Sequence, residues 1–177
     1  PTADGPVIQK SSQTALRNGF VTEQVFELTA ALRKDYPELG IVLFSYYNPI
    51  FFLGNEEFAR RASEAGADGV LIVDVPFEER GEIEPVLNRY GLELIPLISP
   101  LSGAERMKKI TAGCRSFVYY ITVCGVTGTR SAMPSDLKEK LTLLRSVSPA
   151  PVAAGFGIST PETARSAAEF ADGIVIG

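Results

Sequence analysis

"PVAAGFGISTPETARSAAEFADGIVIG" (Pro151–Gly177) contains all the parts of one strand-helix-strand unit in order. Two nearly continuous apolar runs, PVAAGFG (Pro151–Gly157) and DGIVIG (Asp172–Gly177), predict buried strands. Between them, TPETARSAAEFA predicts a helix that Thr160 caps and that has Pro161 at its first position. This order is typical of a parallel sheet covered by helices.

The same alternation extends over most of the chain. Four further apolar runs predict strands: GIVLFSYYNP (40–49), GVLIVDVP (69–76), LELIPLISP (92–100) and SFVYYITV (116–123). Their spacing is typical of β-α units with right-handed crossovers. It fits either a doubly wound sheet or a (β/α)8 barrel and does not separate the two.

Amphipathic stretches predict helices between these strands. One runs from Thr22 to before Pro37, with Val25, Leu28 and Leu32 facing inward. Further helices are predicted from Asn55 (NEEFARRASEAGA), over 103–112 and after Ser135 as N-cap (SDLKEKLTLLRSV). Another is predicted over 78–90, where Pro85 would break the helix or delay its start.

Composition excludes several classes of protein. The chain has 177 residues, 45% of them hydrophobic and 21% charged, with a net charge of −4 and scattered Lys and Arg, which argues against nucleic acid or an anionic membrane as partner. No apolar run reaches the roughly 18 residues of a transmembrane helix. The two cysteines lack metal-ligand spacing, which indicates a reducing, cytoplasmic setting without a metal site. Because histidine is absent, proton transfer would need carboxylate, Tyr or Lys groups.

Glycine-containing turns follow the last three predicted strands. They are GVTGTR (125–130), GFGIST (155–160) and Gly177, and the second leads into the helix capped by Thr160. Each turn alone is ordinary loop composition. Together they match the place where barrels bind phosphate, which favours the barrel.

The predicted strand ends also carry apolar and aromatic side chains: Phe44, Tyr46, Leu71, Leu97, Tyr119 and Phe156. For Leu71 and Leu97, an ordinary place in the core is an equally good interpretation. An apolar slot beside an anion site predicts a substrate with an aromatic head and a phosphorylated tail.

The segments ADGPVIQ, SYYNP, GVLIVDVP, FVYY, GVTG and GFGIST resemble, in order and spacing, the tryptophan synthase alpha chain family. The resemblance runs over residues 1–177 and implies a (β/α)8 barrel, seen from the loop after strand 2 to the end of strand 8. We therefore expect a single barrel domain over 1–177, with the first two strands and the C-terminal helix outside the sequence. Six of eight strands would leave two open sheet edges, so we expect residues 1–177 not to fold alone.

The resemblance implies that the chain cleaves indole-3-glycerol phosphate to indole and glyceraldehyde 3-phosphate. Asp4, which by composition alone is a turn residue in PTADGP, would be catalytic and face the indole N–H. A second carboxylate would lie on barrel strand 2, outside these residues. The substrate-binding residues implied are Phe44, Tyr46, Leu71, Tyr119, Thr127, Gly128, Phe156, Gly157 and Gly177.

The resemblance also implies a partner. This is a tryptophan synthase beta chain, joined in an alpha2-beta2 heterotetramer and carrying pyridoxal phosphate, whereas the alpha chain needs no cofactor. Pro1, Asn48 and Pro76 would face the partner.

The chain departs from the family before GVTG. Thr122-Val123-Cys124 stands where the family usually has Ser-Arg followed by Thr or Ala. The missing Arg keeps open an alternative function, a catalytically impaired subunit that mainly activates the beta chain. A lyase without a partner and a sugar-phosphate isomerase are further alternatives.

Overall fold

A computed structural model of the chain describes residues 4–122, 134–158 and 160–176. The chain divides into two compact units, one formed by residues 1–11 and 96–177 and the other by residues 12–95. Helix α1 (Pro6–Arg17) begins directly after the Asp4-Gly5 turn. Among the described residues, no helix has the length and apolar character needed to cross a membrane.

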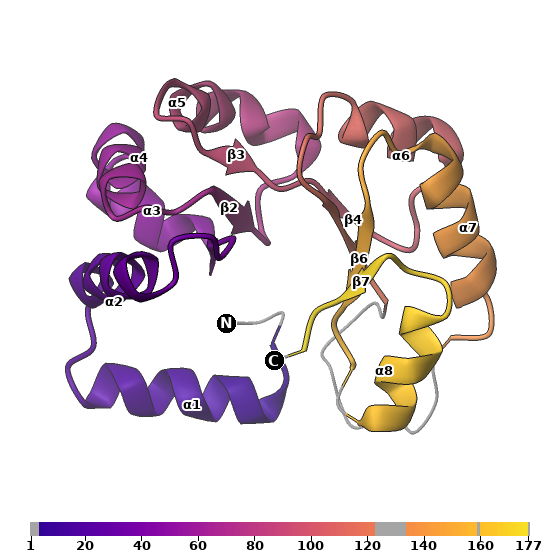
Figure 1. Cartoon of the computed structure of the whole chain (residues 1–177), viewed down its shortest axis with the longest axis horizontal. Coiled ribbons are helices and arrows are strands. Elements are labelled where there is room, and N and C mark those ends of the chain that lie inside the picture. Colours follow the sequence, from indigo (N-terminus) through magenta and orange to yellow (C-terminus); the bar gives the residue numbers. More distant parts are fainter. Residues whose placement is uncertain (1–3, 123–133, 159, 177) are drawn as a thin grey trace. The chain divides into compact units, whose positions relative to one another are not determined.

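The unit of residues 12–95 holds a parallel sheet of order β1-β2-β3. Its strands are β1 (Val42–Ser45), β2 (Gly69–Ile72) and β3 (Glu93–Leu94); its helices are α2 (Thr22–Asp35), α3 (Tyr47–Leu53), α4 (Asn55–Glu64), the 3-10 helix η1 (Phe77–Glu82) and α5 (Glu84–Arg89). All four residues of β2 are buried, as expected for a parallel strand covered on both faces. The helices gather on one side of the sheet (Figure 1).

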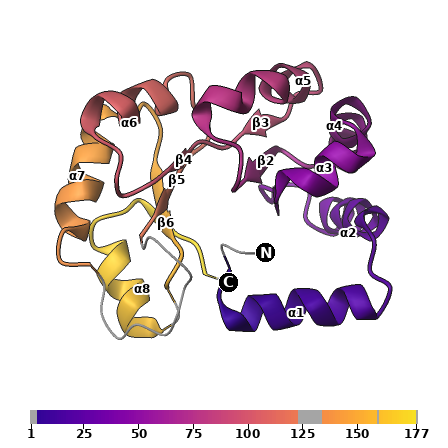
Figure 2. The same cartoon turned by 180° about the vertical axis from the view of Figure 1, so that it is seen from behind.

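The other unit holds a parallel sheet of order β4-β5-β6-β7. Its strands are β4 (Leu97–Ile98), β5 (Val118–Ile121), β6 (Val152–Gly155) and β7 (Gly173–Ile174); its helices are α6 (Ala104–Thr111), α7 (Leu137–Val147) and α8 (Pro161–Ala168). All three helices flank the same side of this sheet in both views (Figure 1, Figure 2). They bury an apolar stripe that includes Met107, Leu141 and Leu144.

The predicted strand at 92–100 is divided into β3 and β4, which pair with different neighbours. Pro96 lies between them and has no N–H to continue a ladder, although its carbonyl accepts a bond from the Tyr119 N–H. Leu28, expected to face inward on α2, is 58% exposed, because this helix buries Phe26 and Thr29 instead. The N-cap of α7 is Asp136 and not Ser135. The cap at Thr160 is confirmed, since its side chain accepts a bond from the Thr163 N–H.

Two aspartates occupy the same position before two strands. Asp68 precedes β2 and Asp172 precedes β7, each within an Ala-Asp-Gly sequence. The backbone N–H of each donates at 2.8 Å to a carbonyl at the start of the neighbouring strand, that of Ile41 just before β1 or that of Val152, the first residue of β6. The aspartate carboxylate accepts the N–H of that same residue, at 2.7 Å and 2.9 Å respectively. The two β-α-β segments thus share one arrangement of hydrogen bonds.

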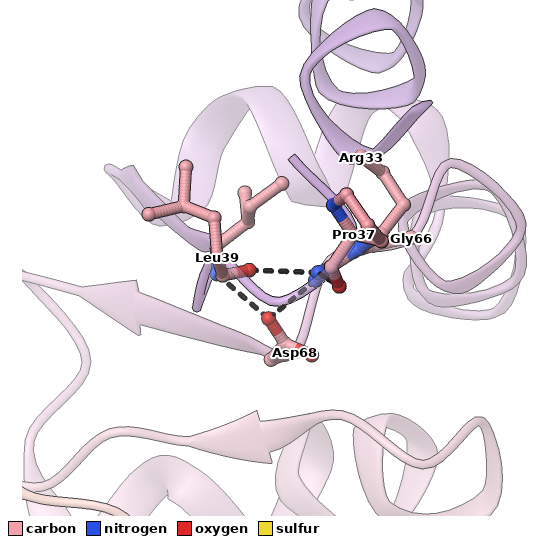
Figure 3. Close-up of polar contacts among 6 residues, drawn as sticks. Arg33, Pro37, Leu39, Gly66 and Asp68 are labelled. Atoms are coloured by element: carbon pink, nitrogen blue, oxygen red, sulfur yellow. Dashed lines mark hydrogen bonds and ion pairs between the residues drawn. The ribbon is translucent and has the colours of Figure 1, made fainter. Parts of the chain in front are cut away.

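An arginine from the helix that precedes the neighbouring strand completes each arrangement. Arg33 of α2 bonds Asp68 at 2.6 Å, and Arg145 of α7 bonds Asp172 at 2.7 Å. Arg33 makes more contacts, because its guanidinium also donates to the carbonyl oxygens of Gly66, Pro37 and Leu39 (Figure 3). It therefore joins the end of α2, the loop before β1 and the turn before β2.

Replacing Arg33 by alanine is expected to lower the free energy of unfolding by about 2–3 kcal/mol, because several charge-assisted hydrogen bonds are lost together. Arg145→Ala is the matched control. It removes one exposed ion pair and is expected to cost less than about 1 kcal/mol. Urea unfolding of both variants measures the difference. Equal losses would show that the carbonyl contacts of Arg33 contribute nothing.

Candidate active site

Asp4 lies half-buried in the turn before α1, in the unit that contains β4 to β7. Its backbone carbonyl accepts a bond from Gln9 Nε2 at 2.8 Å, which ties the turn to the first turns of α1. Its charge acts on Tyr119 of β5 and raises the pKa of that phenol. The structure thus brings together two predicted site residues that are distant in the sequence.

Tyr119 is buried, with 3% of its surface exposed, and lies beside Phe156. The ring centroids are 5.8 Å apart with planes at 86°, an edge-to-face contact. Burial raises the pKa of Tyr119 to about 12; a hydrogen bond from the Phe156 backbone opposes the rise and the Asp4 charge adds to it. Tyr119 is therefore a neutral phenol near neutral pH.

The raised pKa makes stability depend on pH in a predictable direction. The folded protein keeps the Tyr119 proton up to about pH 12, whereas the unfolded chain loses it near the ordinary value of 10.0. The contribution of the Tyr119 proton to the free energy of unfolding is therefore complete below about pH 10 and is lost as the pH rises towards 12. We expect the free energy of unfolding to fall more steeply over this range in the unchanged protein than in Tyr119→Phe. Parallel urea-unfolding profiles of the two proteins would contradict this.

Gly155, at the end of β6, was not among the predicted site residues. A Cβ at this position would overlap the hydroxyl and the ring of Tyr119. The absence of a side chain is therefore what lets the phenol lie against the end of β6. The sequence alone does not reveal this requirement, because it depends on the register of β5 and β6, in which Ile121 pairs with Gly155.

The turn after β6 has an unusual backbone. Phe156 has φ of 65° and Gly157 has φ of 77°, so both adopt the left-handed conformation. Glycine does so at little cost, but a residue with a side chain does not. Thr122, which follows β5, donates its hydroxyl to the Phe156 carbonyl and its N–H to the Gly155 carbonyl. Thr122 is a second residue that the sequence did not indicate as part of the site.

The residues predicted on β1 and β2 lie in the other unit. Phe44 pairs with Leu71 in the register of β1 and β2, so the two lie on the same face. Leu71 is 2% exposed and Phe44 is 50% exposed. Val70 and Ile72, the neighbours of Leu71, pack into the core cluster formed with the helices, and alternation directs Leu71 to the opposite face. Leu71 and Phe44 thus lie on the face of the sheet opposite the helices, where an apolar ligand slot is expected. That a ligand binds there stays a prediction.

Two further predicted residues lie at the start of α3, and a third precedes η1. Tyr46 is the half-buried N-cap residue of this helix, and Asn48 in its first turn is exposed. The Asp74 carboxylate accepts a bond from the Tyr47 N–H at 2.8 Å and so satisfies a donor at the start of α3. Pro76 is exposed just before η1. Pro1, Thr127, Gly128 and Gly177, as well as Val123 and Cys124, lie outside the described residues.

Asp4, Tyr119, Phe156 and Gly157 together offer a carboxylate, a buried neutral phenol, an aromatic face and a backbone turn with left-handed geometry. The carboxylate can stabilise a positive charge that develops on a bound ring. A backbone N–H of such a turn can bind an anion. In the described part of the chain, no group of three or more Cys, Asp or Glu side chains could hold a metal ion.

Comparisons with known proteins agree with this arrangement. The family model described as "Tryptophan synthase alpha chain" matches residues 1–177. The chain is 42% identical over 178 residues to the tryptophan synthase alpha chain of Aquifex aeolicus, and 43% identical over 177 residues to that of Carboxydothermus hydrogenoformans. These matches cover 100% of this chain and 68% and 66% of the relatives. The chain thus spans about two thirds of the length of the curated relatives it matches.

Solved structures give the same result. The alpha chain of Legionella pneumophila has a TM-score of 0.85 at 36% identity, with 98% of this chain and 63% of that chain covered. A structure described as the tryptophan synthase a2b2 complex of Pyrococcus furiosus has a TM-score of 0.85 at 32% identity, with 100% and 70% covered. These relatives have the (β/α)8 barrel fold, so the predicted fold class is confirmed. On the family model, the sequence identities and the structural matches, the chain belongs to the tryptophan synthase alpha chain family.

Proposed function

We propose that this chain, as part of a tryptophan synthase alpha subunit, cleaves indole-3-glycerol phosphate to indole and glyceraldehyde 3-phosphate. The observation that carries the proposal is the edge-to-face packing of the buried Tyr119 on Phe156, directly before the left-handed Gly157, in the unit that also contains Asp4. Membership of the family supplies the substrate class. Both described units belong, in this proposal, to one barrel domain in the cytoplasm.

The cleavage needs a positive charge on the indole ring. Protonation of ring carbon C3 leaves that charge shared between C2 and the ring N–H, and the Asp4 carboxylate stabilises it through a hydrogen bond to the N–H. When the adjacent glycerol hydroxyl loses its proton, the bond from C3 to the side chain breaks. Its electron pair returns to the ring to give indole, and the carbon that carried the hydroxyl becomes the aldehyde. A second carboxylate would move the C3 and hydroxyl protons.

The remaining parts of the site have binding roles. The ring of Phe156 and the neutral phenol of Tyr119 would line an apolar slot for the indole ring. The family resemblance assigns the same role to Phe44, Tyr46 and Leu71. The Gly157 N–H binds the phosphate in this proposal. The family resemblance assigns the same role to Gly128 and Gly177 and the positioning of Asp4 to Thr127, all three outside the described residues.

A beta chain is the partner in this proposal, and it carries pyridoxal phosphate. Support comes from α3, where Phe51 is 67% exposed and Phe52 is 92% exposed, next to the exposed Asn48. Adjacent exposed aromatic side chains on one short helix are typical of an interface with another protein. Pro1 and Pro76 complete the predicted contact.

Indole release from indole-3-glycerol phosphate by the full-length protein tests the proposal, with and without a tryptophan synthase beta chain. We expect cleavage in both cases and faster cleavage with the partner. Activation of the beta chain without any indole release would instead support the alternative, an impaired subunit that acts as an activator. Neither cleavage nor activation would overturn the assignment.

A further inference from the structure

The backbone N–H and the side-chain hydroxyl of Thr122 both donate to carbonyl oxygens where β6 ends and the next turn begins. Thr122 follows β5 and has 1% of its surface exposed. Its N–H donates to the Gly155 carbonyl at 2.9 Å, which extends the pairing of β5 with β6 by one bond. Its hydroxyl donates to the carbonyl of Phe156, one residue further. The hydroxyl therefore holds the first residue beyond the strand.

Phe156 needs such a constraint. It is the sole non-glycine residue with positive φ in the parts of the chain that the structure describes, at 65°. The left-handed conformation brings a Cβ too close to the backbone, so it persists only where surrounding contacts hold it. The hydrogen bond from Thr122 is a contact of this kind, because it fixes the orientation of the peptide that joins Phe156 to Gly157.

The same turn sets two parts of the substrate site. The ring of Phe156 packs edge-to-face on Tyr119, and the Phe156 backbone bonds the Tyr119 hydroxyl. Gly157 follows with φ of 77°, so the direction of its N–H depends on the peptide held by Thr122. A shift at Phe156 would move an aromatic wall and an anion donor together.

We propose that the Thr122 hydroxyl is a positioning group of the substrate site: by holding the Phe156 carbonyl, it keeps the Phe156 ring and the Gly157 N–H oriented for the indole ring and the phosphate. This role rests on the proposed function, because it assigns ligands to both groups. Thr122 itself contacts neither ligand. Serine would preserve the role, and valine, which has the same shape without the hydroxyl, would abolish it.

Steady-state kinetics of the full-length protein test the role. In Thr122→Val we expect KM for indole-3-glycerol phosphate to rise about tenfold while kcat stays within about threefold, because ground-state and transition-state binding are lost together. Thr122→Ser should stay within about twofold of the unchanged protein. Thr111→Val is the matched control, because Thr111 is also buried and bonds a carbonyl within the same unit. An unchanged KM in Thr122→Val would overturn the proposal.

A double-mutant cycle separates this role from simple packing. Glycine adopts positive φ without support, so Phe156→Gly should make the hydroxyl dispensable for the turn. We expect Thr122→Val to change KM by less than about threefold in the Phe156→Gly background. The same tenfold change in both backgrounds would show that Thr122 acts elsewhere.

Crystal structures without ligand test the role of Thr122 independently of the enzyme activity. Crystal structures of the full-length Thr122→Val and Thr122→Ser proteins should show Phe156 leaving the left-handed region in the first and keeping it in the second. If the unchanged protein releases no indole, the proposed function fails and this comparison alone decides the role of Thr122. A left-handed Phe156 in Thr122→Val would overturn it. If Thr122→Val does not fold, Thr122→Ala removes the same hydroxyl.

Discussion

Replacing Asp4 by asparagine is expected to lower kcat for indole-3-glycerol phosphate cleavage by at least about 100-fold while the fold is retained. Asparagine has nearly the same size but no charge, so it cannot stabilise the positive charge on the protonated indole ring. Asp4 is half-buried in the turn before α1, and its backbone carbonyl accepts a bond from Gln9 that the substitution leaves in place. Because asparagine also keeps the shape of the side chain, the loss should appear mainly in catalysis.

The Asp4 prediction is measured as indole release by the full-length protein, with thermal unfolding as the check on folding. Asp35→Asn is the matched control, since Asp35 is an exposed carboxylate at the end of α2. Its kcat should match that of the unchanged protein. If kcat of the Asp4→Asn protein stays within about threefold of the unchanged value, Asp4 takes no part in the chemistry.

Replacing Gly155 by alanine is expected to lower the free energy of unfolding by about 2–3 kcal/mol, since the new methyl group needs the space that Tyr119 occupies. The phenol would have to leave its place against Phe156 and the end of β6. Activity should fall with it, because the same ring lines the proposed slot.

Gly173→Ala is the matched control for Gly155→Ala. It lies on β7 of the same sheet, and among the described residues its Cβ would meet only the Ala153 Cβ, at an ordinary 3.8 Å. We expect a cost below about 0.5 kcal/mol in urea unfolding. Adding Tyr119→Val to Gly155→Ala should recover part of the lost stability. Equal costs at the two glycines, or no recovery, would contradict the overlap with Tyr119.

Apolar patterning predicted the sheets well and some connections poorly. Continuous apolar runs placed β1, β2, β5, β6 and β7 because both faces of a parallel strand are covered. Helices α1 and α3 were missed, since Asp4-Gly5-Pro6 and Asn48-Pro49 have the composition of turns. The start of α3 uses the carboxylate of Asp74, a contact far along the chain that local patterns do not contain.

The site was predictable only in part for a similar reason. Asp4 is a common turn residue by composition, and only the resemblance assigned it a catalytic role; the structure adds its action on Tyr119. Gly155 and Thr122 depend on how β5 aligns with β6 and on the left-handed Phe156. These features belong to the paired strands and not to either strand alone.

The central claim is that the Asp4 carboxylate binds the indole N–H at the edge of the Tyr119–Phe156 pair while the turn at Gly157 binds the phosphate. A crystal structure of the full-length protein with an unreactive analogue, in which a plain propyl chain replaces the glycerol, tests it most directly. We predict an Asp4 oxygen at about 2.7–3.2 Å from the ring nitrogen and a phosphate oxygen at similar distance from the Gly157 nitrogen. An analogue bound with Asp4 turned to solvent, or with its phosphate away from Gly157, would contradict the claim.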